Sequence, residues 1–421
     1  MRVASIVILG SLILAACSHL GGGTAVPAGP ANTNAASRIS PDTRTSPDSN
    51  DAITLHSFKG QASGGEPAAS LVNVKGTLYG TTSSYGGGYG TVFAISPLGK
   101  FRTVYKFRGQ PDGAYPLADL TLLNGQLYGT ASAGGVHGDG TVYTISPAGT
   151  EHTVYSFGRA GDGLDPESRL LVENGVLYGT TRQGGKHSEG TVFAVSQAGQ
   201  ESVIHSFAGA PSDGAHPRGG LVAHDNWFYG TTVAGGKTAG GGAVYKVNAL
   251  GQEKVLHAFD FTPGDGKGPN GMLLYYDGVF FGTTRGGGTR SLGTIYEITP
   301  QGHELVIHSF GSKLDGAYPV AGLALDNGEL YGTTSGGGYS PRRANECISS
   351  GAIRPDGYYR CGTIFRTDPF GTEHVVYRFR GDPNGANPES GLRNVGGVLY
   401  GTTFWGGTSE FYGTVFRIIP K

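Results

Sequence analysis

The sequence predicts an all-β protein, a seven-bladed β-propeller whose blades each have four strands. A phrase close to LYGTT recurs seven times, beginning at Leu78, Leu127, Leu177, Phe228, Phe280, Leu330 and Leu399. Each copy lies in a unit of about 50 residues that holds four short runs of alternating apolar residues, and glycine-rich turns separate these runs. A fixed period of this length with several short strands per unit is typical of propeller blades.

The chain begins with an expected export signal, residues 1–16. Arg2 precedes an apolar stretch that is too short to cross a bilayer as a permanent helix. The following Leu14-Ala15-Ala16-Cys17 resembles a bacterial lipoprotein signal, which implies that Cys17 is lipidated. The alternative is an ordinary cleaved signal with an incidental cysteine. Because Ser18 stands where such signals carry an aspartate for inner-membrane retention, we expect an exported outer-membrane lipoprotein of the cell envelope.

Residues 17–52 are expected to be the lipidated cysteine and a disordered tether. They are rich in Gly, Ala, Pro, Asn, Ser and Thr and nearly lack large apolar side chains, so they cannot form a core. The folded unit is then residues 53–421, which would contact the membrane only through the lipid anchor.

A turn with a small polar residue, glycine, two further residues and proline precedes each first strand. The copies are SGGEP at 63–67, DGAYP at 112–116, DGLDP at 162–166, DGAHP at 213–217, DGKGP at 265–269, DGAYP at 315–319 and NGANP at 384–388. Asp-Gly and Asn-Gly are expected to supply positive φ, and the proline enters a strand without needing a ladder donor. A calcium site is the competing interpretation, but one aspartate per blade offers too few of the roughly six to eight oxygens that calcium takes.

The fourth strand of each blade carries a tyrosine or a histidine two residues before a phenylalanine. These residues are His56, Tyr105, Tyr155, His205, His257, His308 and Tyr377. Strand alternation places each ring on the same side as the phenylalanine. We interpret the histidines as aromatic packing between blades rather than as ligands, and the sequence predicts no metal site.

The fourth-strand runs also predict how the ring closes. They occur at 53–58, 103–107, 153–157, 203–207, 255–259, 306–310 and 375–379, whereas the chain ends on a third-strand run at 413–419. The strand at 53–58 is therefore expected to pair with 413–419 and to complete the last blade, which removes the open sheet edge. A β-helix is the rival fold, but its rungs do not alternate with glycine-rich hairpins.

The LYGTT, paired-glycine and GTVF blocks, followed by SP-x-G, resemble the GloVer-type tandem repeat of exported bacterial proteins. The resemblance covers essentially all of residues 53–421. It implies export and envelope attachment, and it implies no specific activity. A looser likeness to kelch repeats lies in the period and in the paired glycines, although the aromatic pattern after the glycines differs from kelch.

One loop departs from the repeat: the sixth unit carries an insertion at about 339–361. Cys347 and Cys361 lie in it and are expected to form a disulfide in an oxidising envelope, since two cysteines without a nearby histidine are too few for a metal site. Interface-forming side chains accompany them, namely Arg342, Arg343, Arg354, Tyr358, Tyr359 and Arg360. The alternative is a solvated loop that the disulfide protects from proteolysis.

The insertion emerges on the face that collects the glycine-rich loops. On this face Trp405, Phe411 and Tyr412 come from the seventh repeat. Aromatic rings among polar groups suit a carbohydrate or a partner protein. Together with the arginines and tyrosines of the insertion, these three residues are the predicted binding residues.

The sequence favours a binding protein that takes a polysaccharide or an envelope protein through this loop face. With 31 basic and 32 acidic residues the chain is nearly neutral, which argues against a nucleic-acid partner. No contiguous catalytic or cofactor motif is present, so no cofactor is expected. Two alternatives stay open: a glycan lyase or hydrolase at the propeller axis, with His137, His187 and His216 as candidates, and a purely structural envelope protein.

Overall fold

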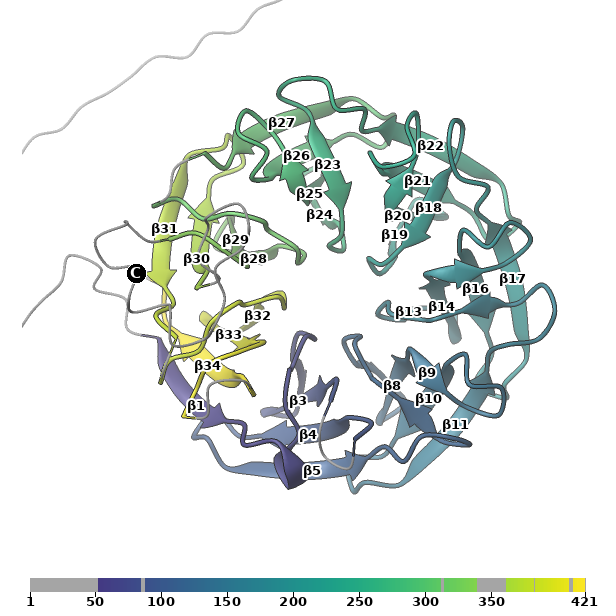
Figure 1. Ribbon diagram of the computed structural model, residues 1–421, viewed down its shortest axis with the longest axis vertical. Coiled ribbons are helices and arrows are strands. Elements are labelled where there is room, and N and C mark those ends of the chain that lie inside the picture. The colour runs from purple at the N-terminus through teal and green to yellow at the C-terminus, as the bar shows by residue number, and fades with distance from the viewer. Residues whose placement is uncertain are drawn as a thin grey trace, which may run out of the picture. The chain divides into compact units, whose positions relative to one another are not determined.

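The computed structural model describes residues 52–84, 88–311, 314–338, 361–381, 383–408 and 412–420. The chain divides into two units, Met1–Thr45 and Ser46–Lys421, and all described residues belong to the second unit. They form seven four-stranded antiparallel sheets arranged around a common axis (Figure 1). The predicted seven-bladed propeller is thereby confirmed. The predicted signal peptide, Cys17 and almost all of the tether lie outside the described residues.

In six blades the four strands run from the axis to the rim in chain order. The last blade has three strands from the C-terminal part of the chain in this order and takes the first strand of the folded unit as its rim strand. The innermost strands are β2 (Val72–Val74), β7 (Thr121–Leu123), β13 (Leu171–Glu173), β19 (Val222–His224), β24 (Leu274–Tyr276), β28 (Ala324–Asp326) and β32 (Arg393–Val395). The second strands are β3 (Thr77–Thr82), β8 (Gln126–Ala131), β14 (Val176–Thr181), β20 (Trp227–Gly235), β25 (Val279–Gly287), β29 (Glu329–Thr334) and β33 (Val398–Thr403).

The two outer layers complete the blades. The third strands are β4 (Thr91–Ile95), β10 (Thr141–Ile145), β16 (Thr191–Val195), β21 (Ala243–Val247), β26 (Thr294–Ile298), β30 (Thr363–Thr367) and β34 (Thr414–Ile418). The rim strands are β5 (Phe101–Lys106), β11 (Glu151–Ser156), β17 (Glu201–Ser206), β22 (Glu253–Ala258), β27 (Glu304–Ser309), β31 (Glu373–Arg378) and β1 (Ile53–Ser57).

Short pairings join the turns to the loops above them. β6 (Gly113–Ala114) pairs with β9 (Ala133–Gly134), β12 (Gly163–Leu164) with β15 (Gln183–Gly184), β18 (Gly214–Pro217) with β20, and β23 (Gly266–Pro269) with β25. A single turn of 3-10 helix, η1 (Gln61–Ser63), follows β1. In the described part of the chain, no helix is long and apolar enough to span a membrane.

The repeated phrase encodes contacts within each blade. A Cβ on Gly80, the glycine of the first LYGTT, would lie 2.6 Å from the ring of Phe93, so only glycine lets the aromatic residue of the GTVF strand pack here. The second threonine of the phrase, Thr82, shares a hydrogen bond of 2.8 Å with Thr91 on the neighbouring strand. Both contacts are buried and recur in other blades, so these blocks are scaffold, as the sequence predicts.

The turns hold the aspartates as predicted, and the expected positive φ is present at Gly64, Gly316 and Gly385 but not at the glycine of the turn 112–116. Asp112 accepts hydrogen bonds from the backbone amides of Gly113 and Arg108, at 2.7 and 3.0 Å. In this turn the positive φ is at Tyr115, the residue before the proline, with φ 57°, whereas Gly113 is not in the left-handed region. Glycine is needed at 113 because a Cβ would lie 2.8 Å from the side chain of Ala131. Here the Asp-Gly pair therefore serves close packing rather than φ.

The ring closes by the predicted pairing of the two ends of the folded unit. β1 pairs antiparallel with β34, with Ile53 opposite Arg417 and Ser57 opposite Thr414. Beyond β1, the backbone amide of Phe58 donates to the carbonyl of Gly413 at 3.0 Å. The Phe58 ring is fully buried in a cluster with Phe93 and Val415, which joins the last blade to the first. The predicted bounds, 53–58 and 413–419, agree with the observed strands to within one residue at each end.

Phe58→Ala should lower the free energy of unfolding by about 3–5 kcal/mol, because a fully buried phenyl ring at the closure leaves a cavity when it is removed. Urea denaturation of both proteins measures the difference. Ile53→Ala is the matched control, since Ile53 lies on the same closing strand but is 48 % exposed. Equal losses in the two variants would contradict a closure that depends on the Phe58 contacts.

Candidate functional site

The residue that follows each turn proline lies at the propeller axis. One such residue comes from every blade, and all seven line the axial space: Ala68, Leu117, Glu167, Arg218, Asn270, Val320 and Glu389. The proline fixes where the chain leaves the turn, so the next residue reaches the axis in every blade. We call these seven residues the axial ring. Their side chains differ from blade to blade, unlike the scaffold that positions them.

Two cavities meet at the axial ring. The upper cavity has a volume of about 1270 Å³ and is lined on one side by the turn and loop of the fifth blade, 261–268 and 285–289. The lower cavity has a volume of about 410 Å³ and is lined by the innermost strands and the residues before them. Six cationic side chains and four carboxylates line the two cavities, and no histidine of the described residues does so.

Two arginines of the upper cavity are neutralised by neighbouring carboxylates. Arg218 Nε lies 2.8 Å from Glu167 Oε2, and Arg182 lies 3.4 Å from Asp165 and 3.9 Å from Glu167. Burial raises the pKa of Glu167, although the charges of both arginines oppose this rise. This group of four residues is a closed ion-pair network on one side of the axis.

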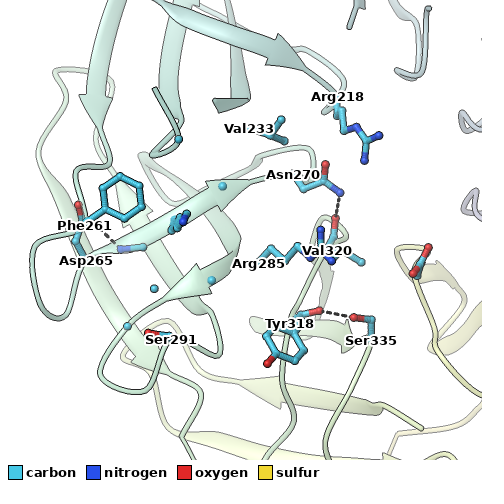
Figure 2. A pocket seen from close by; sticks show the side chains of 18 of the residues that line it. Arg218, Val233, Phe261, Asp265, Asn270, Arg285, Ser291, Tyr318, Val320 and Ser335 are labelled. Carbon is cyan, nitrogen blue, oxygen red and sulfur yellow. Dashed lines mark hydrogen bonds between the residues drawn. The ribbon is translucent and has the colours of Figure 1, made fainter. Parts of the chain in front are cut away.

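The adjoining wall, which the fifth blade forms, is cationic and partly aromatic (Figure 2). Arg285 is exposed at the end of β25 and makes no ion pair with the described residues. Lys267 Nζ lies 4.3 Å from the ring centroid of Phe261, which is 50 % exposed. Asn270 donates its amide to the carbonyl of Val320 at 3.2 Å, while its Oδ1 is buried without a hydrogen-bond partner among the described residues (Figure 2). This wall offers cations, a ring and an unused acceptor.

Two more arginines meet in the lower cavity. Burial lowers the pKa of Arg393, and the positive charge of Arg169 lowers it further, whereas Asp119 opposes this change. Arg393 Nε donates to the carbonyl of Leu71 at 2.8 Å, and Asp119 accepts the backbone amide of Ser70 at 2.6 Å. Neither arginine forms an ion pair with a carboxylate of the described residues. Arg169 and Arg393 therefore lie in the lower cavity near Asp119, which is already hydrogen-bonded.

A second constellation lies between blades, toward the rim. At five of the seven interfaces, three side chains from two neighbouring blades come together. The first is the tyrosine or histidine of a rim strand, the second is the aspartate of the turn that follows this strand, and the third is the glutamate that begins the rim strand of the next blade. The sets are Tyr105, Asp112 and Glu151; Tyr155, Asp162 and Glu201; His205, Asp213 and Glu253; His257, Asp265 and Glu304; and His308, Asp315 and Glu373. We call these sets the interface clusters.

The glutamates of the interface clusters have raised pKa values. Burial, with the charge of the neighbouring aspartate, raises the pKa of Glu201, Glu253 and Glu304 to about 7 and that of Glu373 to about 8. The tyrosines donate to the aspartates at 2.8 Å (Tyr105) and 2.9 Å (Tyr155). Each cluster thus links two neighbouring blades through a shared carboxylate pair.

The predicted aromatic role of the histidines is also present. His205 contacts Phe207 in a T-shaped arrangement, with ring centroids 4.8 Å apart. His56 differs, because Ser63 and Phe101 occupy the positions of the aspartate and its neighbour in the next rim strand. It stacks on Phe101 at 3.8 Å, and burial lowers its pKa to about 4. The histidines with a full cluster therefore pack as predicted and also face two carboxylates.

Most predicted binding residues cannot be placed. Arg342, Arg343, Cys347, Arg354, Tyr358, Tyr359, Arg360 and Phe411 lie outside the described residues. Cys361 is fully buried just before β30, and its pairing with Cys347 stays a prediction. Trp405 is half-buried beside Phe404, with ring centroids 5.7 Å apart, and it is Phe404 that lines the upper cavity. Tyr412 packs at the closure against Gly60.

The candidate catalytic histidines do not come together at the axis. His137 and His187 are exposed, and His216 lies 3.4 Å from Glu189; none of the three lines either cavity. The axial ring and the rim glutamates were not predicted from the sequence. Both had a signal: the residue after each turn proline changes from repeat to repeat, and GxE opens five of the seven rim strands.

These features define a class: a seven-bladed propeller with a charged axial channel and ionisable groups between its blades. The Gloeobacter/Verrucomicrobia repeat pattern matches residues 43–193 and 160–343. The chain belongs to this repeat family, as the resemblance of its repeated blocks implies. No curated protein matches the chain.

Solved structures similar to this chain are distant. A protein of unknown function from Bacteroides thetaiotaomicron has 13 % identity and a TM-score of 0.42 over 82 % of this chain and 85 % of that one. A gluconolactonase from Xanthomonas campestris has 11 % identity and a TM-score of 0.40, over 88 % and 90 %. A protein assigned as a 6-phosphogluconolactonase from Bacteroides uniformis has 11 % identity and a TM-score of 0.45, over 73 % and 83 %. Similarity at this level carries no argument about activity.

Glu201→Gln should stabilise the protein above pH 7 and leave its stability unchanged near pH 4. The raised pKa of Glu201 means that the folded state holds the proton more tightly than the unfolded chain does. The resulting stabilisation is complete below the usual glutamate pKa and is lost as the pH rises through about 7. Because the side chain is half-buried and screened, we expect a gain of roughly 1 kcal/mol at pH 8, measured by urea denaturation across the pH range.

Glu329→Gln is the control of opposite sign. The guanidinium of Arg366, at 2.7 and 2.8 Å from the two carboxylate oxygens, lowers the pKa of Glu329. Its contribution to stability is therefore present at neutral pH and lost in acid, so the variant should be less stable at pH 7, and the difference should shrink as the pH falls through the lowered pKa. A Glu201→Gln variant that loses stability at pH 8 would contradict a raised pKa of the glutamate in the cluster.

Proposed function

We propose that the protein binds an acidic carbohydrate in its axial channel. The observation that carries this proposal is that three cavity-lining arginines have no carboxylate partner among the described residues: Arg285 in the upper cavity and Arg169 with Arg393 in the lower one. Guanidinium groups bind carboxylates and phosphates in a forked, bidentate geometry. An anionic ligand would supply the counter-charge that these three side chains lack.

The upper cavity suits a sugar more than a compact anion. Its volume of about 1270 Å³ exceeds the roughly 300–1,000 Å³ of a typical small-molecule site, so it has room for several sugar units. Phe261, Tyr318 and Phe404 contribute aromatic surface to the wall. Asn270 and Glu389 offer hydrogen-bond acceptors for hydroxyl groups. Aromatic surface together with acceptors and unpaired cations fits a polymer that contains uronic acids.

The predicted insertion extends this proposal. Ser335, which lines the upper cavity, is close in sequence to the insertion with its arginines and tyrosines. We propose that they add contacts to the polysaccharide, with an envelope protein as the alternative partner. Export and lipidation at Cys17 would present the channel to envelope or extracellular polysaccharides.

An enzyme remains the second candidate class, and binding is favoured over it. A lyase or hydrolase needs an acid and a base placed on both sides of the scissile bond. The carboxylates at the axis are engaged: Glu167 pairs with two arginines, Asp119 accepts a backbone amide, and Glu389 accepts the amide of Asn387 at 2.9 Å. These contacts suit ligand recognition better than proton transfer.

Titration of the full chain with trigalacturonate should show binding, whereas maltotriose, a neutral trisaccharide, should not bind detectably. Calorimetry should give an affinity that falls with salt, as expected for ion pairs. Arg285→Gln should weaken binding about tenfold or more, because a charge-assisted contact is lost. Arg102→Gln is the matched control: this arginine is exposed on rim strand β5, donates to the carbonyl of Pro147, and lines neither cavity.

Three outcomes would contradict the proposal: equal affinity for the acidic and neutral sugars, equal loss in both arginine variants, or no binding of trigalacturonate. Proton NMR of the same mixtures separates binding from catalysis. New unsaturated or reducing-end signals would show a lyase or a hydrolase, whereas an unchanged spectrum of the free sugar supports a binding protein.

A further inference from the structure

Three consecutive interface clusters each bring a histidine and two carboxylates together. In His205/Asp213/Glu253, His257/Asp265/Glu304 and His308/Asp315/Glu373, one ligand atom from each residue lies within 4.8 Å of the other two. The three residues come from different elements: a rim strand, the turn after it and the rim strand of the next blade. The same construction is repeated at three neighbouring interfaces, and of its nine residues Asp265 alone also lines the upper cavity.

In two of the three clusters the histidine and the aspartate are farther apart than in an ordinary hydrogen bond. His257 and His308 Nε2 lie 3.5 and 3.6 Å from the aspartate oxygen, whereas His205 Nε2 is hydrogen-bonded to Asp213 at 3.1 Å. Nitrogen–oxygen hydrogen bonds are commonly about 2.9 Å long. Two ligand atoms at roughly 2.1 Å from a tetrahedrally coordinated zinc ion would be separated by roughly 3.4 Å. The observed separations bracket this value.

Several ligand atoms are also buried without a close partner. The Oε1 atoms of Glu253 and Glu304 are enclosed and make no hydrogen bond with the described residues, and the enclosed Nε2 atoms of His257 and His308 reach their aspartates only at 3.5 and 3.6 Å. Buried polar atoms in native structures normally have a partner. A bound cation would satisfy imidazole nitrogen and carboxylate oxygen at once.

Solvent reaches one of these clusters directly. His257, Asp265 and Glu304 line a cavity of about 360 Å³ at the rim, together with Asp260 and Thr262. An ion can therefore enter from outside, and water can occupy its remaining coordination position. One imidazole excludes the all-oxygen coordination that calcium and magnesium prefer and favours a first-row transition metal.

We propose that each of the three histidine interface clusters binds one divalent transition-metal ion of the zinc type, held by histidine Nε2, the turn aspartate and the rim glutamate. Each ion then links two neighbouring blades. Together the three sites cross-link four consecutive blades, from the one that ends in β17 to the one that ends in β31.

The tyrosine clusters provide controls within the same molecule. Tyr105 and Tyr155 stand in place of the histidine with the aspartate and the glutamate unchanged, and each phenol donates a hydrogen bond of 2.8 or 2.9 Å to the aspartate. The phenol proton occupies the place of the cation, and a protonated phenol is not a zinc ligand. These two clusters should therefore bind no metal.

The test is a stoichiometry measured on the full chain after removal of metal with a chelator. Titration with zinc, followed by dialysis and elemental analysis, should give three ions per chain. His205→Tyr, His257→Tyr and His308→Tyr should each give two, and these variants recreate a cluster that already exists in other blades. Tyr155→His should give four, because Asp162 and Glu201 are already in place.

His187→Tyr is the control for adventitious binding, since this histidine is exposed and belongs to no cluster; it should leave three ions bound. Cobalt titration of the same proteins should add one visible absorption band of four-coordinate metal per site. The proposal is overturned if zinc does not bind, if the histidine-to-tyrosine variants keep three ions, or if Tyr155→His gains none. Thermal melting of each apo-protein confirms that the variant is folded.

Discussion

The closure of the ring by β1 and β34 is the constraint on which the structure depends. The last blade has three strands from the C-terminal part of the chain, and the backbone groups at the edge of β34 would be unpaired without a fourth. This blade therefore takes its rim strand, β1, from the start of the folded unit. The interface clusters are incomplete at both interfaces of this blade, where Ser63 with Phe101 and Asn384 with Ala52 replace the aspartate and the glutamate. At the interface with the first blade, apolar contacts take over: His56 stacks on Phe101, and Phe58 fills the seam.

Closure also determines how much sequence variation the axis tolerates. The glycine, threonine and aromatic positions of each repeat are occupied by contacts within a blade, and the turn proline fixes the exit of the chain. Packing within the blade does not constrain the residue after the proline, which explains why arginine, glutamate, asparagine and valine all occur there. Side chains about 50 residues apart in sequence therefore meet at the axis. They can differ between blades without changing the contacts within a blade.

The fold followed from the sequence because periodicity and turn chemistry are local signals. Seven repeats, four runs per repeat and the unmatched strand at 53–58 were sufficient to predict the blades and their closure. The axial site did not follow, because single residues such as Arg169 and Arg393 gain meaning only when the ring brings them together. The histidines were correctly predicted to pack, yet their carboxylate neighbours come from the next blade, and a repeat considered alone does not show that contact.

The exchange of tyrosine for histidine at the interface clusters preserves the packing but changes what the side chain offers to the carboxylates, a proton or a lone pair. Both rings make the same T-shaped contact with the following phenylalanine, as Tyr155 and His205 show. A phenol at neutral pH always brings a proton to the aspartate, so the two oxygens approach closely. A neutral imidazole brings either a proton or a lone pair, and a lone pair would face the lone pairs of two carboxylates. The longer separations at His257 and His308 exceed those of a shared proton and leave room for the metal ion proposed above. The packing against the phenylalanine is thus the same in both kinds of cluster. Among the described residues, three histidine clusters have room for a positive ion where the tyrosine clusters have the phenol proton.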